Sequence, residues 1–127
     1  MCFTVGWYDT GMLVDCTGSL GLEATDELAK TVSGALDTLV RPTHLILDWR
    51  GIQGEPYRCH LCTEQVVRLA HHNLVRVAAV ASDSIVSLWI HLLAQEREGR
   101  YLACTSLEQA ILLFRGGEKP LAPQFRV

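Results

Sequence analysis

The sequence predicts an α/β fold: a single domain with a mixed sheet of four or five strands and helices packed beside it. Three observations predict it, namely an N-terminal pair of short apolar runs, two continuous apolar runs typical of buried strands, and helical periodicity after each buried run. Alternating strands and helices imply right-handed crossovers between parallel strands, so the initial hairpin supplies the antiparallel edge. A length of 127 residues with 49% hydrophobic content suits one domain with one core.

The first elements are a hairpin and a helix. Apolar and β-branched runs at 2–8 and 12–16 flank Asp9-Thr10-Gly11, a turn composition that predicts a hairpin. Apolar residues then recur at three- and four-residue steps, which predicts a helix over 22–40. Thr25 is the expected N-cap, and the acidic residues that follow it suit the positive end of a helix.

Two buried strands are predicted in the middle of the chain. Residues 44–48 form a continuous apolar run that Asp48 ends, and residues 75–81 form a second run followed by Ser82-Asp83. A loop and then a helix over 57–73 connect them. If both strands are parallel, the two aspartates lie at the same edge of the sheet, where open α/β sheets bind ligands.

The last third repeats the pattern of helix, strand and helix. The strongest helical periodicity in the chain begins after Ser84 and ends at Gly99, and its apolar stripe consists of Ile85, Leu88, Trp89, Leu92 and Leu93. A short strand over 101–104 and a helix over 107–114 follow. We therefore expect one domain over 1–117 and an extended tail over 118–127.

Charge and composition narrow the functional classes. The net charge is −3, so no basic surface is predicted for nucleic acid. Residues 1–48 carry a net charge of −5 and residues 49–127 a net charge of +2, so a partner would meet two different faces. No apolar run reaches the roughly 20 residues of a membrane helix, and no signal peptide is recognisable. The expectation is a cytoplasmic protein without membrane association, whose five cysteines are reduced thiols.

Three short segments resemble the STAS family of sulphate-transporter tails and anti-sigma-factor antagonists, and more narrowly its SpoIIAA-like branch. They are Leu45-Ile-Leu-Asp-Trp-Arg-Gly-Ile52, Val77-Ala-Ala-Val-Ala-Ser-Asp83 and Ser106-Leu-Glu-Gln-Ala110. The resemblance spans roughly residues 3 to 115. It implies a non-enzymatic binding or regulatory module that contacts a protein partner or a small apolar or anionic ligand.

One feature of the family's phosphorylation switch is missing from this chain. In the antagonists that the sequence resembles, a phosphorylatable serine lies where the second helix begins, about ten residues beyond the strand-ending aspartate. Counting from Asp48 leads to Tyr57, Arg58 and Cys59, and Thr63 comes about one turn too late. The expected function is therefore binding that does not depend on phosphorylation.

A thiol redox or sensor function is the alternative. Cys59 and Cys62 form a C-x-x-C pair at a helix start, where the helix dipole and Arg58 would lower the pKa of the first thiol. Zinc is not expected, because His71 and His72 would lie about 14 Å beyond Cys62 on the same helix, at its solvated end. No metal and no cofactor are predicted.

The candidate binding residues lie after the first buried strand, at the start of the second helix and on the third helix. Trp89 lies on a helix whose apolar arc, with Ile85 and Ile90, is wider than one core face requires, which fits either a homodimer interface or packing under the tail. The charged and aromatic members of the set would orient a ligand. The set is Asp48, Arg50, Tyr57, Arg58, Cys59, Asp83 and Trp89.

Overall fold

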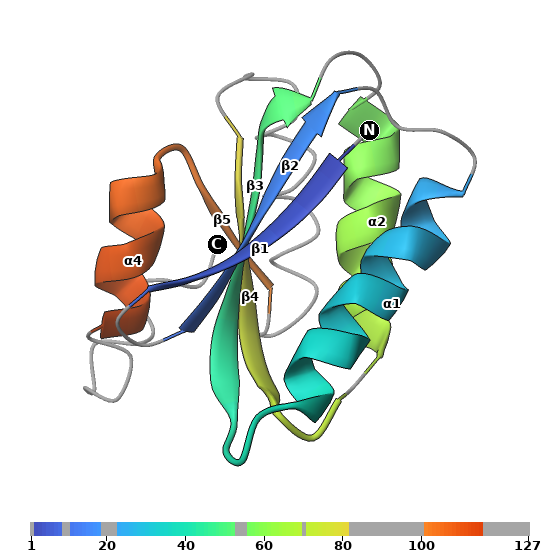
Figure 1. Cartoon of the computed structure of the whole chain (residues 1–127). Helices are drawn as coiled ribbons and strands as arrows, with labels where there is room; N and C mark the ends of the chain where they lie inside the picture. The colour runs from blue at the N-terminus through green and yellow to red at the C-terminus, as the bar shows by residue number, and fades with distance from the viewer. Residues whose placement is uncertain are drawn as a thin grey trace.

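The computed structural model describes residues 2–8, 11–18, 23–52, 56–69, 71–81 and 101–115. Five strands form one sheet in the order β1-β2-β3-β4-β5 (Figure 1). β1 (Cys2–Tyr8) pairs antiparallel with β2 (Gly11–Gly18), and parallel pairs then join β2 to β3 (Thr43–Ile52), β4 (Leu74–Val80) and β5 (Tyr101–Cys104). The predicted hairpin edge, the parallel sheet and the α/β class are confirmed.

Three described helices cover the two faces of this sheet. α1 (Ala24–Asp37) and α2 (Pro56–Arg68) lie together on one face, and α4 (Leu107–Arg115) lies on the other (Figure 1). No helix in the described part of the chain is long and apolar enough to cross a membrane. The helix predicted from Ser84 to Gly99 and the tail over 118–127 lie outside the described residues.

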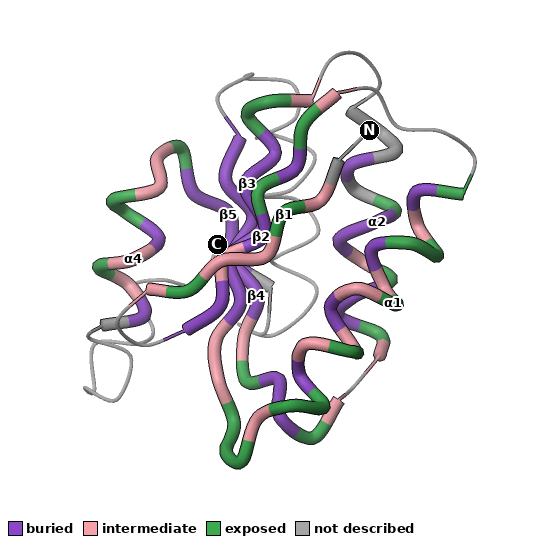
Figure 2. Tube along the Cα trace, in the orientation of Figure 1, coloured by how far each residue is buried: buried purple, intermediate pink, exposed green. Residues whose placement is uncertain are grey.

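Successive residues of the central strand point to opposite faces, which gives the domain two apolar clusters. Leu45 and Leu47 pack beneath α1 and α2, whereas Ile46 packs with Phe114 of α4. Because both faces of β3 are covered, the strand is a run of buried residues, shown in purple in Figure 2. The apolar run that predicted this strand thus reflects burial on both sides.

The prediction that Thr25 caps the first helix is wrong. The helix begins at Ala24, and Glu23 is its N-cap without a side-chain hydrogen bond. The Thr25 hydroxyl instead lies 3.4 Å from the sulfur of Cys62. A contact with α2 has therefore replaced the local cap.

The second helix is shorter than the predicted 57–73, because residues after Arg68 serve the end of α1. The Asn73 side-chain amide donates hydrogen bonds to the carbonyls of Leu36 (3.0 Å) and Leu39 (3.1 Å). These carbonyls lie at the end of α1, where helical hydrogen bonding stops, and that of Leu36 also accepts the Leu39 backbone N–H at 3.1 Å. Asn73 is buried, so the two bonds replace water.

His71 takes part in the same junction and does not lie on a solvated helix end, as the sequence predicted. Its Nδ1 accepts the Asn73 backbone N–H at 3.0 Å, so the ring hydrogen lies on Nε2. Nε2 then donates to the Asp37 carboxylate at 2.7 Å. The connection between α2 and β4 is thereby fixed against the end of α1.

Candidate functional site

Asp48 and Arg50 form a closely bonded pair on β3. One carboxylate oxygen of Asp48 accepts from the backbone N–H (3.1 Å) and Nε (2.9 Å) of Arg50, and the other accepts from Nη2 at 2.8 Å. The Asp48 side chain is 10% exposed and that of Arg50 is 39% exposed. The pair therefore joins a nearly buried carboxylate to a guanidinium that still faces solvent.

The expectation that Asp48 ends its strand is wrong, because β3 continues to Ile52. Asp48 lies opposite Asp15 of β2, and the next aligned pair is Thr17 with Gly51, so β3 holds one extra residue in a bulge. A bulge redirects side chains, and here the Arg50 guanidinium lies against Asp48, two residues earlier. The pair lies where β3 stops pairing with β4, whose last aligned pair is Asp48 with Val80.

The charges of two further carboxylates act on the guanidinium. The pKa of Arg50 is raised, first by its hydrogen bond to Asp48 and then by the negative charges of Asp48, Asp15 and Glu108. Asp15 and Glu108 are both exposed. We call Asp15, Asp48, Arg50 and Glu108 the acidic rim, which carries three carboxylates and one cation.

Glu108 is held in place by the start of α4. The hydroxyl of Ser106 accepts the Gln109 backbone N–H at 3.1 Å, which is the geometry of a helix N-cap. The Gln109 side chain in turn accepts from the Thr105 N–H at 3.3 Å. These bonds fix the first turn of α4, and with it Glu108, beside the ends of the strands.

Cys59 is not part of this rim. It is 1% exposed and packs in the cluster beneath α1 and α2, with Cys62 and Trp49. Burial raises the pKa of the Cys59 thiol to about 12, and the nearby Cys62 adds to the rise. The predicted lowering of this pKa is therefore wrong. A reactive redox thiol needs the opposite shift, so the geometry does not favour the thiol alternative.

Thr63, the threonine nearest the expected phosphorylation position, is fully buried and engaged. Its hydroxyl accepts a hydrogen bond from the Trp49 indole N–H at 2.9 Å and donates one to the Cys59 carbonyl at 2.9 Å. Both roles of the hydroxyl are therefore occupied inside the core.

The structure brings together two of the seven predicted site residues, Asp48 and Arg50. The backbones of Tyr57 and Arg58 lie in the first turn of α2, but their side chains are outside the described part. Asp83 and Trp89 lie outside the described residues, so their site roles and the homodimer through that helix remain predictions. The sequence analysis missed Asp15 and Glu108. The available signal was that Asp15 is the one charged residue in the predicted strand 12–16.

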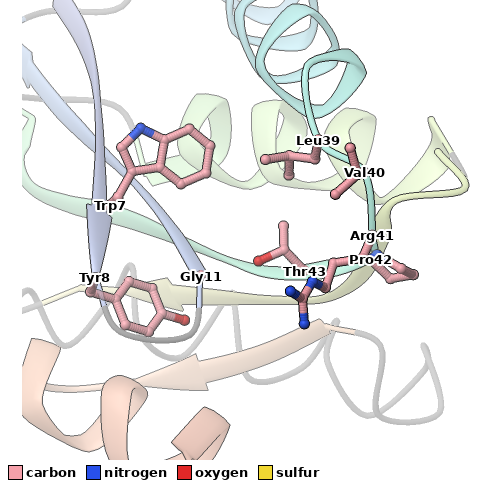
Figure 3. A pocket seen from close by; sticks show the side chains of 8 residues that line it. All are labelled: Trp7, Tyr8, Gly11, Leu39, Val40, Arg41, Pro42 and Thr43. Atoms are coloured by element: carbon pink, nitrogen blue, oxygen red, sulfur yellow. The ribbon is translucent and has the colours of Figure 1, made fainter.

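A second feature that the sequence did not predict is a hollow at the other end of the sheet. It has a volume of about 550 Å³ and lies between the end of β1 and the connection from α1 to β3. Figure 3 shows Trp7 and Tyr8 on one side and Leu39, Val40 and Arg41 on the other. Its walls come from segments that are far apart in the sequence, so no local motif could reveal it.

Comparison with known proteins supports the fold. No protein-family model matches the chain, and no curated protein matches it significantly. Among solved structures, it is similar to an uncharacterized protein of the DUF3478 family with a SpoIIAA-like fold from Shewanella loihica PV-4. The identity is 12% and the TM-score 0.63, and the match covers 89% of this chain and 92% of the other. The chain therefore has the SpoIIAA-like fold that the sequence resemblance implied.

Proposed function

We propose that this chain is a non-enzymatic binding or regulatory domain that recognises a protein partner through the acidic rim. The observation that carries the proposal is the Asp48–Arg50 pair, with Asp15 and Glu108 beside it. Like charges opposite each other in neighbouring strands are destabilising, and Asp15 lies opposite Asp48. A binding role gives a reason for retaining such a pair.

The charge of the rim favours a basic partner. Three carboxylates outnumber one guanidinium, so the local field attracts lysine and arginine side chains. Two of these carboxylates, Asp15 and Glu108, are exposed and available for contact. The same charge disfavours the anionic ligand that was the other expectation for this region. Binding should weaken with added salt, because exposed charge pairs are screened within about 8 Å at physiological ionic strength.

We propose that recognition does not depend on phosphorylation of the chain. Residues 53–62 contain neither serine nor threonine. Thr63 is buried, and its hydroxyl both donates and accepts within the core. A kinase could reach this hydroxyl only if α2 separated from β3, so the buried threonine supports constitutive binding.

Native mass spectrometry of the chain purified from its own host tests the proposal. The rim variant combines Asp15→Asn and Glu108→Gln, which removes two exposed charges without touching the buried pair. The control variant combines Asp26→Asn and Glu27→Gln, which removes two exposed charges from the first turn of α1.

We expect a companion protein with the wild type and with the control, and at least a tenfold smaller bound fraction with the rim variant. Equal binding by all three chains would contradict the proposal. So would a chain that is recovered without any companion at low salt.

A further inference from the structure

The hollow at the amino end of the parallel strands is a second candidate site. Trp7 is 56% exposed and Val40 96% exposed, so both present apolar surface to solvent at this hollow. The volume of about 550 Å³ lies within the range of about 300–1,000 Å³ for small-molecule sites. The hollow is therefore large enough to hold a compact organic ligand.

Hydrogen bonds with Asn73 fix one wall of the hollow. Its side chain donates to the Leu39 carbonyl at 3.1 Å, and its own carbonyl accepts the Thr43 N–H at 2.8 Å. Leu39 and Thr43 bracket the exposed residues 40–42. Opposite them, the Tyr8 hydroxyl lies over the buried Gly11, where a Cβ atom would come within 2.6 Å of it. Both sides are thus preformed, which lowers the entropy lost on binding.

The side chains around the hollow specify the chemistry of its occupant. Among the described residues that line it, Arg41 is the only charged one, and the structure gives it no ion-pair partner within the described part of the chain. Figure 3 shows its guanidinium directed into the hollow beneath Thr43. The Trp7 indole, on the other side, offers an aromatic face for stacking.

We propose that this hollow binds a small aromatic anion, with its ring against Trp7 and its carboxylate, sulfonate or phosphate on Arg41. An arginine fork binds such groups through paired, charge-assisted hydrogen bonds. The site is separate from the acidic rim. Thr43 and Asp48 are five residues apart along β3, or about 16 Å at about 3.3 Å per residue. The hollow carries the positive charge of Arg41, whereas the acidic rim has a net negative charge.

Titration followed by NMR of the tryptophan indole N–H signals tests the site. Trp7→Phe identifies the Trp7 signal by its loss, and the probes are 1-naphthalenesulfonate and the uncharged 1-naphthalenemethanol. We expect the sulfonate to shift the Trp7 signal and to bind at least fivefold more tightly than the alcohol. Arg41→Gln should remove that difference and leave binding of the alcohol unchanged.

The matched control is Arg68→Gln, which removes one positive charge from α2, where Arg68 is exposed and pairs with Glu64. This variant should bind both probes as the wild type does. Loss of sulfonate binding in Arg68→Gln as well would reduce the effect to net charge and overturn the proposal. Equal binding of the two probes by the wild type would also overturn it. So would a Trp7 signal that responds to protein concentration and not to the probes, because a second copy would then cover the hollow.

Discussion

Replacement of Arg50 by alanine should destabilise the domain far more than replacement of Arg68 by alanine. Both arginines place Nη2 2.8 Å from a carboxylate oxygen. The carboxylates differ in their surroundings and in their number of bonds. Within the described part of the chain, Asp48 accepts three hydrogen bonds, all from Arg50, and its side chain is 10% exposed. Glu64 is 18% exposed and pairs with the 62% exposed Arg68 one turn along α2.

The expected cost follows from what each carboxylate loses. Arg50→Ala removes two charge-assisted bonds and, among the described residues, leaves Asp48 the backbone N–H as its one donor. Breaking a fully buried pair costs about 3–5 kcal/mol. Because Arg50 is 39% exposed, water can reach the vacated position, and we expect about 1.5–3 kcal/mol. The pair of Glu64 with the 62% exposed Arg68 lies one turn apart on a helix. Such a pair contributes about 0.3–0.5 kcal/mol, so Arg68→Ala should cost about that much.

Urea denaturation followed by tryptophan fluorescence measures both changes in the free energy of unfolding. Asp48→Asn with Arg50→Ala completes a double-mutant cycle and isolates the coupling between the two side chains. If Arg50→Ala costs no more than Arg68→Ala, the partly buried pair does not stabilise the rim as its geometry implies.

Three other perturbations test the packing of the domain. Thr63→Val should cost about 1–3 kcal/mol, because it leaves the buried Trp49 indole N–H without an acceptor. Thr63→Ser keeps the hydroxyl and should cost less. Equal losses of stability in urea denaturation would contradict the role of the Thr63 hydroxyl as acceptor. Asn73→Ala should cost about 1–3 kcal/mol and speed hydrogen exchange at the end of α1, since the Leu36 and Leu39 carbonyls each lose the bond from the Asn73 amide. Unchanged exchange there would contradict this role of Asn73. Burial raises the pKa of the Cys16, Cys59 and Cys104 thiols above the ordinary 9.0. These thiols therefore stay protonated in the folded state at a pH where they ionise in the unfolded chain. Stability should therefore be fully present below pH 9 and fall by about 1.4 kcal/mol per pH unit per thiol above it. A urea midpoint that does not change between pH 9 and 11 would contradict the burial of these thiols.

Much of the fold was predictable because its signals are local. The hairpin follows from two apolar runs and the turn between them, and β3 follows from apolar residues that are buried on both faces. The ends of the helices were less predictable because tertiary contacts decide them. Thr25 contacts Cys62 on α2, and Asn73 leaves the predicted helix to bond the end of α1.

The site was predictable only in part, for a related physical reason. Asp48 and Arg50 were identified from one strand, but the bulge beside them depends on pairing with β2. Asp15 and Glu108 join the rim through the sheet and through the start of α4, contacts that no spacing in the sequence reveals. The alternative thiol function required a reactive Cys59, yet the packing of α2 against the sheet buries it.

The most direct measurement is carbodiimide crosslinking of the chain in its own cells, which joins a carboxylate to a lysine amine in contact with it. Peptide mass spectrometry then identifies which carboxylates have reacted with a partner. We expect partner lysines to be joined to Asp15 and Glu108 and absent from Asp26 and Glu27, which are equally free to react on α1. Partner crosslinks at Asp26 or Glu27 with none at Asp15 or Glu108 would contradict recognition through the acidic rim.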